Sequence, residues 1–232
     1  MGKLHDKRFP DESDAYRKAR DRLLAKEMDL RRRLETVAAL RRRLPRGGKL
    51  KEDYVFMEGS RDLRDVDTVQ QTRFSKLFET GKNSLILYSF MYAPDADYPC
   101  PMCTAILDSF NGNVSHVSDR VNFAVVAKAS IQKVRSWARD RGWHRLRLLS
   151  SEKNSYNTDY FAESTKWGQM PAINVFLKNQ DSIYHFYNTE LLYTATEEGQ
   201  HPRHADLVWP LWNLFDMTPE GRGTDWFPKF KY

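Results

Sequence analysis

The sequence predicts an α/β fold with a mixed central sheet and a long N-terminal helical extension. From residue 84 onward, apolar strand-like runs alternate with helix-like segments, and a hairpin of two strands follows. The first 50 residues differ, with 16 Lys and Arg against 8 Asp and Glu, whereas the other 182 carry 21 against 23. We therefore divide the chain into a basic helical extension at 1–50 and a globular domain with an aromatic-rich C-terminal tail at 51–232.

Residues 14–44 are predicted to form one or two long helices. Ser13 can cap the start, apolar residues recur at helical spacing, and Pro45 ends the pattern. Two Arg triplets, at 31–33 and 41–43, are interleaved with acidic residues, which favours a solvated helix face over a nucleic-acid arm. The apolar stripe has to be covered by the domain or by a second copy, so the helix is a candidate homodimer interface.

The elements of the domain follow from apolar runs and from start and stop signals. A continuous apolar run predicts a strand buried on both faces, and Ser130 and Gly142 delimit the second helix. The expected order is strand 84–92, helix 101–118, strand 121–129, helix 130–143, strand 145–151, and the hairpin 171–179 and 182–189. Strands separated by helices and followed by a hairpin imply a mixed sheet.

The order of these elements is the layout of a thioredoxin-like fold. The first apolar strand leads into Cys100 and Cys103, which open a helix, and much later Pro171 opens the first strand of the hairpin. In that fold the bond before the later proline is cis and faces the dithiol. We therefore expect a cis Met170–Pro171 bond, although cis is uncommon for X–Pro bonds in general.

Cys100 and Cys103 are the only cysteines of the chain, and their placement predicts redox chemistry. Pro101 suits the first helical position, and Cys103 lies on the same helix face as Cys100, within disulfide reach. The helix N-terminus favours a thiolate and lowers the pKa of Cys100. Cys100 is thus predicted to be the nucleophile and Cys103 the resolving thiol, acting on a disulfide or a small oxidisable substrate without a cofactor.

The substrate is expected to lie against the backbone of Met170 and Pro171 as an added strand segment. The aromatic residues around the dithiol, Phe90, Tyr92 and Tyr98, are expected to form an apolar wall beside it. Asn157 and Asp159 are read as an Asx turn that starts a helix, and the C-terminal tryptophans as a cap on the core or on an interface.

Two alternatives stay open for the two thiols, and a third is disfavoured. They could be two small buried hydrophobic residues. They could bind copper or zinc together with His116, because the spacing C-x2-C-x12-H is part of a zinc-finger pattern, although His116 could equally be a packing residue. A peroxiredoxin-type site would need proline at 93 and Ser or Thr at 97, where the chain has Ala93 and Asp97.

Composition limits the class of protein. The chain is 41% hydrophobic and 13% aromatic, enough for a sizeable core, and it has no apolar run long enough to span a membrane. Its first residues lack the apolar segment of a secretory signal, so we expect a cytoplasmic protein. The acidic balance of 51–232 argues against nucleic-acid binding by the domain. A non-enzymatic protein that binds a partner through its basic helix is the third function considered.

Several stretches resemble a family of microbial thioredoxin-like proteins, a domain of unknown function often labelled thioredoxin-like or dithiol-disulfide-isomerase-like. The resemblance spans roughly residues 16–232. It is carried by "LYSFMYAPD" before the dithiol, "HVSDRVNFAVVAKASIQKVRSWARDRGW", "LLSSEKNSYNTDY" and "DMTPEGRGTDW". It implies the thioredoxin-like fold with an N-terminal helix, and Cys100 and Cys103 as the reactive centre. It implies no particular substrate.

Overall fold

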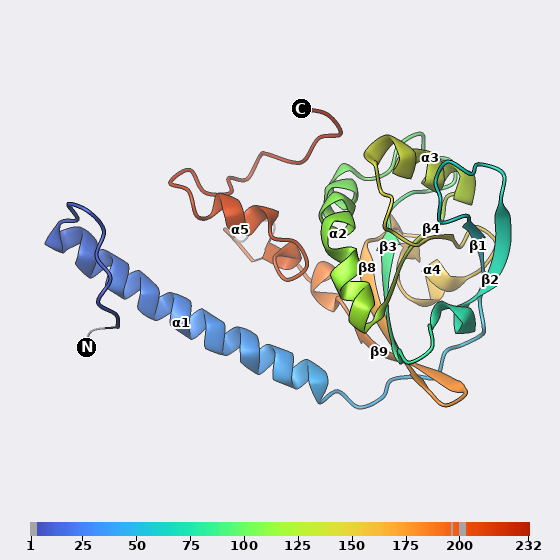
Figure 1. Cartoon of the computed structure of the whole chain (residues 1–232), viewed down its shortest axis with the longest axis horizontal. Coiled ribbons are helices and arrows are strands. Elements are labelled where there is room, and N and C mark those ends of the chain that lie inside the picture. Colours follow the sequence, from blue (N-terminus) through green and yellow to red (C-terminus); the bar gives the residue numbers. More distant parts are fainter. Residues whose placement is uncertain (1–3, 196, 200–202) are drawn as a thin grey trace. The chain divides into compact units, whose positions relative to one another are not determined.

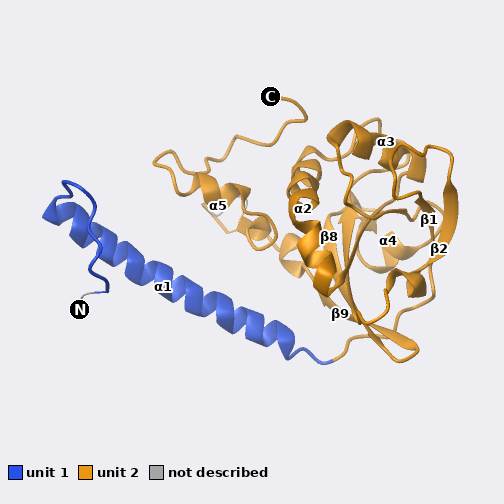
Figure 2. Cartoon of the chain, in the orientation of Figure 1, with its two compact units in different colours: residues 1–45 blue, residues 46–232 orange. Residues whose placement is uncertain are grey.

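The computed structural model describes residues 4–195, 197–199 and 203–232. The chain divides into two compact units, Met1–Pro45 and Arg46–Tyr232 (Figure 2). The boundary lies a few residues before position 50 because the segment after Pro45 pairs with the domain. The Gly47 N–H donates to the His185 carbonyl at 3.0 Å, and the Leu50 N–H donates to the Ile183 carbonyl at 2.8 Å.

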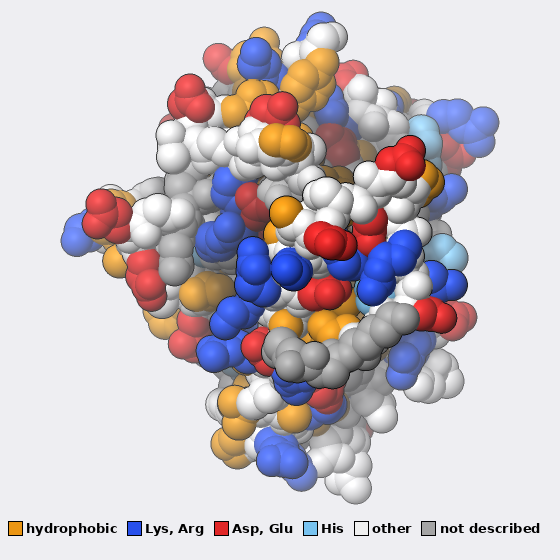
Figure 3. Space-filling model, turned by 90° about the vertical axis from the view of Figure 1, so that its left-hand side faces the viewer, with side chains coloured by type: hydrophobic (Ala, Val, Ile, Leu, Met, Phe, Trp, Pro, Cys, Tyr) orange, Lys and Arg blue, Asp and Glu red, His pale blue; other side chains and the backbone are white. Residues whose placement is uncertain are grey.

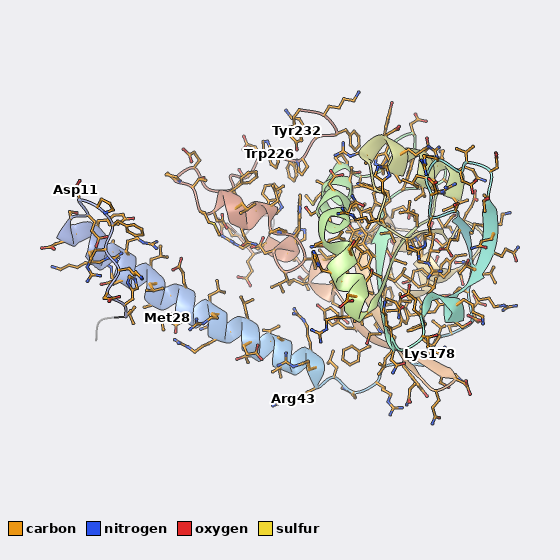
Figure 4. The ribbon with its side chains drawn as sticks, viewed as in Figure 1. Asp11, Met28, Arg43, Lys178, Trp226 and Tyr232 are labelled. Carbon is orange, nitrogen blue, oxygen red and sulfur yellow. The ribbon has the colours of Figure 1, made fainter. Side chains whose placement is uncertain are left out.

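The first unit is built around helix α1, Asp14–Arg42. Ser13 caps it, accepting a hydrogen bond from the Tyr16 N–H at 3.2 Å, and two arginines in the last turn suit the negative end of the helix dipole. Arg17 is buried by the preceding segment, where it donates to the Lys7 carbonyl and pairs with Glu12. Side chains project all along the helix, including the labelled Met28 (Figure 4).

The second unit holds a seven-stranded mixed sheet in the order β2-β1-β5-β4-β3-β8-β9 (Figure 1). The central strands β3, β4 and β5 are parallel, and every other neighbouring pair is antiparallel. The strands are β1 Val55–Gly59, β2 Val69–Arg73, β3 Ser84–Phe90, β4 Asn122–Ala127, β5 Leu148–Ser150, β8 Ala172–Asn179 and β9 Ser182–Asn188. A separate small hairpin is formed by β6 Glu163–Ser164 and β7 Gly168–Gln169.

The helices of this unit cover the two faces of the sheet unequally. Helices α2, Pro101–Arg120, and α3, Ile131–Arg141, share one face, because both parallel crossovers step the same way across the sheet. The return from β5 to β8 crosses the other face, which is covered by the 3-10 helix η1, Phe74–Leu77, and the short α4, Tyr156–Asp159. The β3–α2 junction therefore lies at the C-terminal ends of the parallel strands, in a sheet that is covered on both faces.

This topology confirms the predicted thioredoxin-like fold. The strand before the dithiol lies between its parallel neighbour β4 and the antiparallel hairpin β8–β9, and the helix that begins at the dithiol covers one face. The antiparallel pair β1–β2 extends the sheet beyond β5.

The C-terminal segment packs on the α2 face through buried tryptophans. Trp209, and Trp212 within α5, Leu211–Phe215, join the core. The guanidinium of Arg222 bridges Asp206 and Asp216, with contacts of 3.0 Å to each, and so ties the tail to this segment. The 3-10 turns η2, Glu190–Leu192, and η3, Arg203–Ala205, precede it.

None of the helices in the described ranges has the length and apolarity needed to cross a bilayer. On the face drawn in Figure 3, Lys and Arg side chains are interspersed with Asp and Glu.

Candidate functional site

The two thiols lie where β3 passes into α2, as the sequence predicts. Cys100 occupies the N-cap of α2 in an extended conformation, and Pro101 is the first helical residue. The Cys100 N–H donates to the Met91 carbonyl at 3.0 Å, which ties the cap to the end of β3. The loop between β3 and α2 thus folds back on its first residues and places Cys100 at the C-terminal end of β3.

The structure gives the two thiols different environments. Cys100 is half-buried, Cys103 is 2% exposed, and both are free thiols. The hydrogen bond from Cys103 lowers the pKa of Cys100 to about 6, with help from the Cys103 and Met102 backbone N–H groups and against the effect of burial. The same hydrogen bond, together with burial, raises the pKa of Cys103 well above its ordinary value. One accessible thiolate therefore lies beside one protected thiol.

Tyr88 is a site residue that the sequence analysis missed. It lies two residues before the end of β3, and its hydroxyl is buried with no hydrogen bond of strict geometry among the described residues. The hydroxyl still lies close enough to the Cys103 sulfur to lower the pKa of that thiol. Burial, and then Cys103, raise the pKa of Tyr88 well above its ordinary value, so the hydroxyl stays protonated beside Cys103.

The predicted apolar wall is corrected in two of its three members. Phe90 and Tyr92 are 1% and 5% exposed, so they belong to the core and offer no surface to a substrate. Phe90 is buried because its ring packs edge-on against Trp143. Tyr98 is 66% exposed, and its ring contacts those of Trp137 and Phe230.

Met170 and Pro171 lie at the same end of the sheet as the dithiol, next to the C-terminal end of β3. The next residue, Ala172, pairs with Ser89 near the end of β3, and the Met170 N–H is held by the Ala162 carbonyl at 2.9 Å. Both side chains are half-buried.

A buried polar network on the sheet face opposite α2 contacts the segment before Pro171. The Ser151 hydroxyl donates to the Asn157 side-chain oxygen at 2.6 Å, and Asn157 in turn contacts the Gln169 side chain at 3.4 Å. Asn157 is 1% exposed. Through these two hydrogen bonds it links the end of β5 to the segment before Pro171, in addition to any local turn. Asp159 instead accepts from Lys51, Tyr54 and Ser155.

The structure does not bring His116 to the thiols. His116 lies on the same continuous helix as Cys103, thirteen residues later, which is about 20 Å along the helix axis. Within the described ranges, no group of three or more His, Cys, Asp or Glu side chains is arranged to hold a metal ion. The predicted ligand set of Cys100, Cys103 and His116 is therefore not formed within this chain.

Comparison with protein families gives one match. Residues 7–232 match the family described as "Bacterial protein of unknown function (DUF899)". A comparison with curated proteins finds no match.

Solved structures of several redox proteins are similar to the chain at low identity. A reduced 2-Cys peroxiredoxin from Plasmodium vivax is 14% identical, with 62% of this chain and 81% of that chain covered and a TM-score of 0.45. AhpC from Enterococcus faecalis is also 14% identical, with coverages of 70% and 87% and a TM-score of 0.46. The exposed lipoprotein thioredoxin Etrx1 from Streptococcus pneumoniae strain TIGR4 is 17% identical, with coverages of 58% and 87% and a TM-score of 0.39. Likenesses this distant add no argument of their own, so the fold assignment rests on the strand order described above.

Proposed function

We propose that this chain, which belongs to the bacterial DUF899 family, is a thiol–disulfide oxidoreductase whose Cys100 and Cys103 exchange two electrons with a disulfide substrate. The observation that carries the proposal is the asymmetry of the two thiols at the N-terminus of α2. One has a lowered pKa and is accessible, and its neighbour is buried with a raised pKa. A pair that served only as core packing would have no reason to differ in this way.

The reaction follows from this asymmetry. The Cys100 thiolate attacks one sulfur of the substrate disulfide, forms a mixed disulfide and releases the other sulfur as a thiolate, which takes up a proton from solvent. Cys103 then loses its proton and attacks the Cys100 sulfur, which forms the 100–103 disulfide and releases the second substrate thiol. The substrate gains two electrons and the protein dithiol loses two, so a second thiol compound is needed to reduce the protein again.

Tyr88 is suited to assist the second step. Cys103 is a poor nucleophile while it stays protonated, and its thiolate forms in a buried site where charge is costly. The Tyr88 hydroxyl beside it donates a hydrogen bond as the charge develops, and because the hydroxyl stays protonated it adds no negative charge of its own. In this proposal Tyr88 supports Cys103 and makes no contact with substrate.

A trapping experiment with two single variants tests the proposal. Reduced Cys103→Ser, mixed with oxidised glutathione, is expected to accumulate one glutathione bound to Cys100, because the resolving thiol is missing. Reduced Cys100→Ser is expected to accumulate none on the same time scale, because Cys103 is buried. The wild-type chain is expected to end as the 100–103 disulfide, identified by peptide mapping. Equal labelling of the two variants, or a wild-type chain that stays reduced, would contradict the proposal.

A further inference from the structure

A cleft lies on the sheet face opposite α2. It consists of two adjoining hollows of about 660 and 460 Å³, which share Phe161 and Tyr193 as lining residues. The larger hollow is lined in part by Asn174 and Asn188, and the smaller one by apolar groups that include Trp167 and Met170. A cleft of this size with an apolar half and a polar half fits a small organic molecule.

A β-bulge produces the polar half. The pairing of β8 with β9 shifts between Val175 and Phe176, so that His185 pairs with Phe176 and Asn188 pairs with Asn174. In a regular strand, residues three apart point to opposite faces. The extra residue in β9 turns His185 and Asn188 to the same face, and both line the larger hollow.

These side chains meet at one buried amide. The Asn174 side-chain oxygen accepts a hydrogen bond from the Asn188 amide at 2.8 Å and lies 3.0 Å from His185 Nε2. Asn174 is fully buried and Asn188 is 8% exposed. The remaining polar atoms of this cluster are therefore fixed in direction, as a ligand site requires.

Two buried polar atoms of the cleft have no hydrogen-bond partner among the described residues, the side-chain oxygen of Asn188 and the hydroxyl of Tyr193. Burial raises the pKa of Tyr193, and the nearby Asn188 amide opposes that effect, so the two groups lie close without a hydrogen bond of good geometry. Buried polar atoms in native proteins nearly always have a partner. A ligand that donates to Asn188 and accepts from Tyr193 would satisfy both.

The charges around the polar half favour an uncharged ligand. Burial lowers the pKa of His185, so its ring is neutral at neutral pH. The Asp159 carboxylate, which also lines the hollow, is engaged by Lys51, Tyr54 and Ser155. The other two charged lining residues, Lys49 and Glu190, have opposite signs.

The wall between the two hollows is an exposed aromatic residue in a strained conformation. Phe161 has a φ of 58°, in the left-handed region that bulky residues rarely adopt, and it is 70% exposed. Phe161 is the left-handed residue that ends α4, where the Ala162 N–H donates to the Asn157 carbonyl at 2.7 Å, but glycine is the usual residue there and neither this cap nor the core requires an aromatic side chain. An exposed aromatic wall between two hollows suits a planar ring.

We propose that this cleft binds a small uncharged aromatic molecule, which lies against Phe161 and donates an N–H or O–H hydrogen bond to Asn188. The proposed contacts at Phe161 and Asn188 involve neither cysteine, so their test does not depend on the proposed thiol–disulfide activity.

Titration of the full chain with benzamide tests the proposal. Benzamide has a planar ring, no charge and an N–H donor, whereas methyl benzoate lacks the donor and benzoate is charged. In ¹⁵N-resolved NMR spectra, benzamide is expected to shift the Trp167 indole signal and the Asn188 side-chain signal, with saturation at millimolar concentrations. Methyl benzoate and benzoate are expected to bind at least about fivefold more weakly, because they cannot donate to Asn188.

Two variants and a matched control locate the binding. Asn188→Leu removes the acceptor and is expected to weaken benzamide binding about tenfold. Phe161→Gly removes the wall while a glycine tolerates the backbone conformation, so it should fold and also bind about tenfold more weakly. Gln180→Gly removes a second non-glycine residue of positive φ, in the β8–β9 turn outside the cleft, and is expected to bind as wild type.

The predicted ligand class is wrong if benzamide gives no saturable shift below about 20 mM, or if methyl benzoate binds equally well. The predicted binding site is wrong if Phe161→Gly binds benzamide with wild-type affinity. If Asn188→Leu does not fold, the Phe161→Gly result decides.

Discussion

Replacing Cys103 by alanine is expected to raise the pKa of Cys100, since the hydrogen bond from Cys103 is the largest cause of its low value of about 6. A hydrogen bond to a charged group contributes about 1.5–3 kcal/mol. At 1.36 kcal/mol per unit, its loss corresponds to about 1–2 units. The pKa in Cys103→Ala is thus expected at about 7–8, still below the free value of about 8.5, because the backbone N–H groups of the helix N-terminus remain.

The assay is the rate of alkylation by iodoacetamide as a function of pH, with the modified residue identified by mass spectrometry. A shift of about 1.5 units lowers the thiolate fraction at pH 6 about fifteenfold, but a more basic thiolate is about fivefold more nucleophilic. The rate at one pH would therefore change only about threefold, so the midpoint of the pH profile is the quantity to measure.

Cys103→Ser is the matched control, because serine keeps an O–H donor at the same position. Its midpoint is expected within about half a unit of the wild-type value. The reasoning is refuted if Cys103→Ala keeps the wild-type midpoint, since the helix N-terminus alone would then set the pKa. It is refuted equally if the wild-type midpoint lies near that of a free cysteine.

Three further outcomes are expected. The folded pKa of Cys100 lies below its unfolded value of about 8.5, so the thiolate stabilises the reduced protein above that pH and this contribution is lost as the pH falls through about 6. The Tm of the reduced wild type relative to Cys100→Ser should accordingly decrease from pH 8.5 to pH 5, and a constant difference would contradict the lowered pKa. Tyr88→Phe should slow the decay of the mixed disulfide about tenfold in stopped-flow trapping while the alkylation midpoint of Cys100 stays unchanged; an unchanged decay would remove the role given to Tyr88. Arg222→Ala should lower the free energy of local unfolding of the tail by about 2 kcal/mol and speed amide exchange around Asp216, with the chemistry of the thiols intact. Exchange as slow as in the wild type would show that the tail is held by its aromatic contacts alone.

Much of the fold could be predicted because the signals are local. The apolar run of β3, the proline at the first position of α2 and the glycine after α3 each act within a few residues. The placement of Cys100 at a helix N-cap follows from the same local signals. The strand order then follows from the handedness of the crossovers and from the short turn of the final hairpin.

The parts that were missed depend on contacts between elements. Phe90 and Tyr92 are consistent with an exposed wall in sequence, and only the packing of Trp143 and the loop after β3 buries them. Tyr88 meets Cys103 because of how α2 lies over β3, which no periodicity reports. His116 fitted a ligand spacing, but the unbroken helix carries it away from the thiols. The bulge that turns His185 and Asn188 to one face likewise has no sequence signal here, since no glycine marks it.

The redox equilibrium of the dithiol tests the central claim most directly. The reduced chain is equilibrated with glutathione at a series of fixed ratios of reduced to oxidised form, quenched with acid, and the free thiols are alkylated and counted by mass spectrometry. The account predicts one reversible two-electron transition between the free dithiol and the 100–103 disulfide, lost in both Cys100→Ser and Cys103→Ser. A chain that stays reduced at every ratio, or that stops at glutathione bound to Cys100 without forming the internal disulfide, would contradict it.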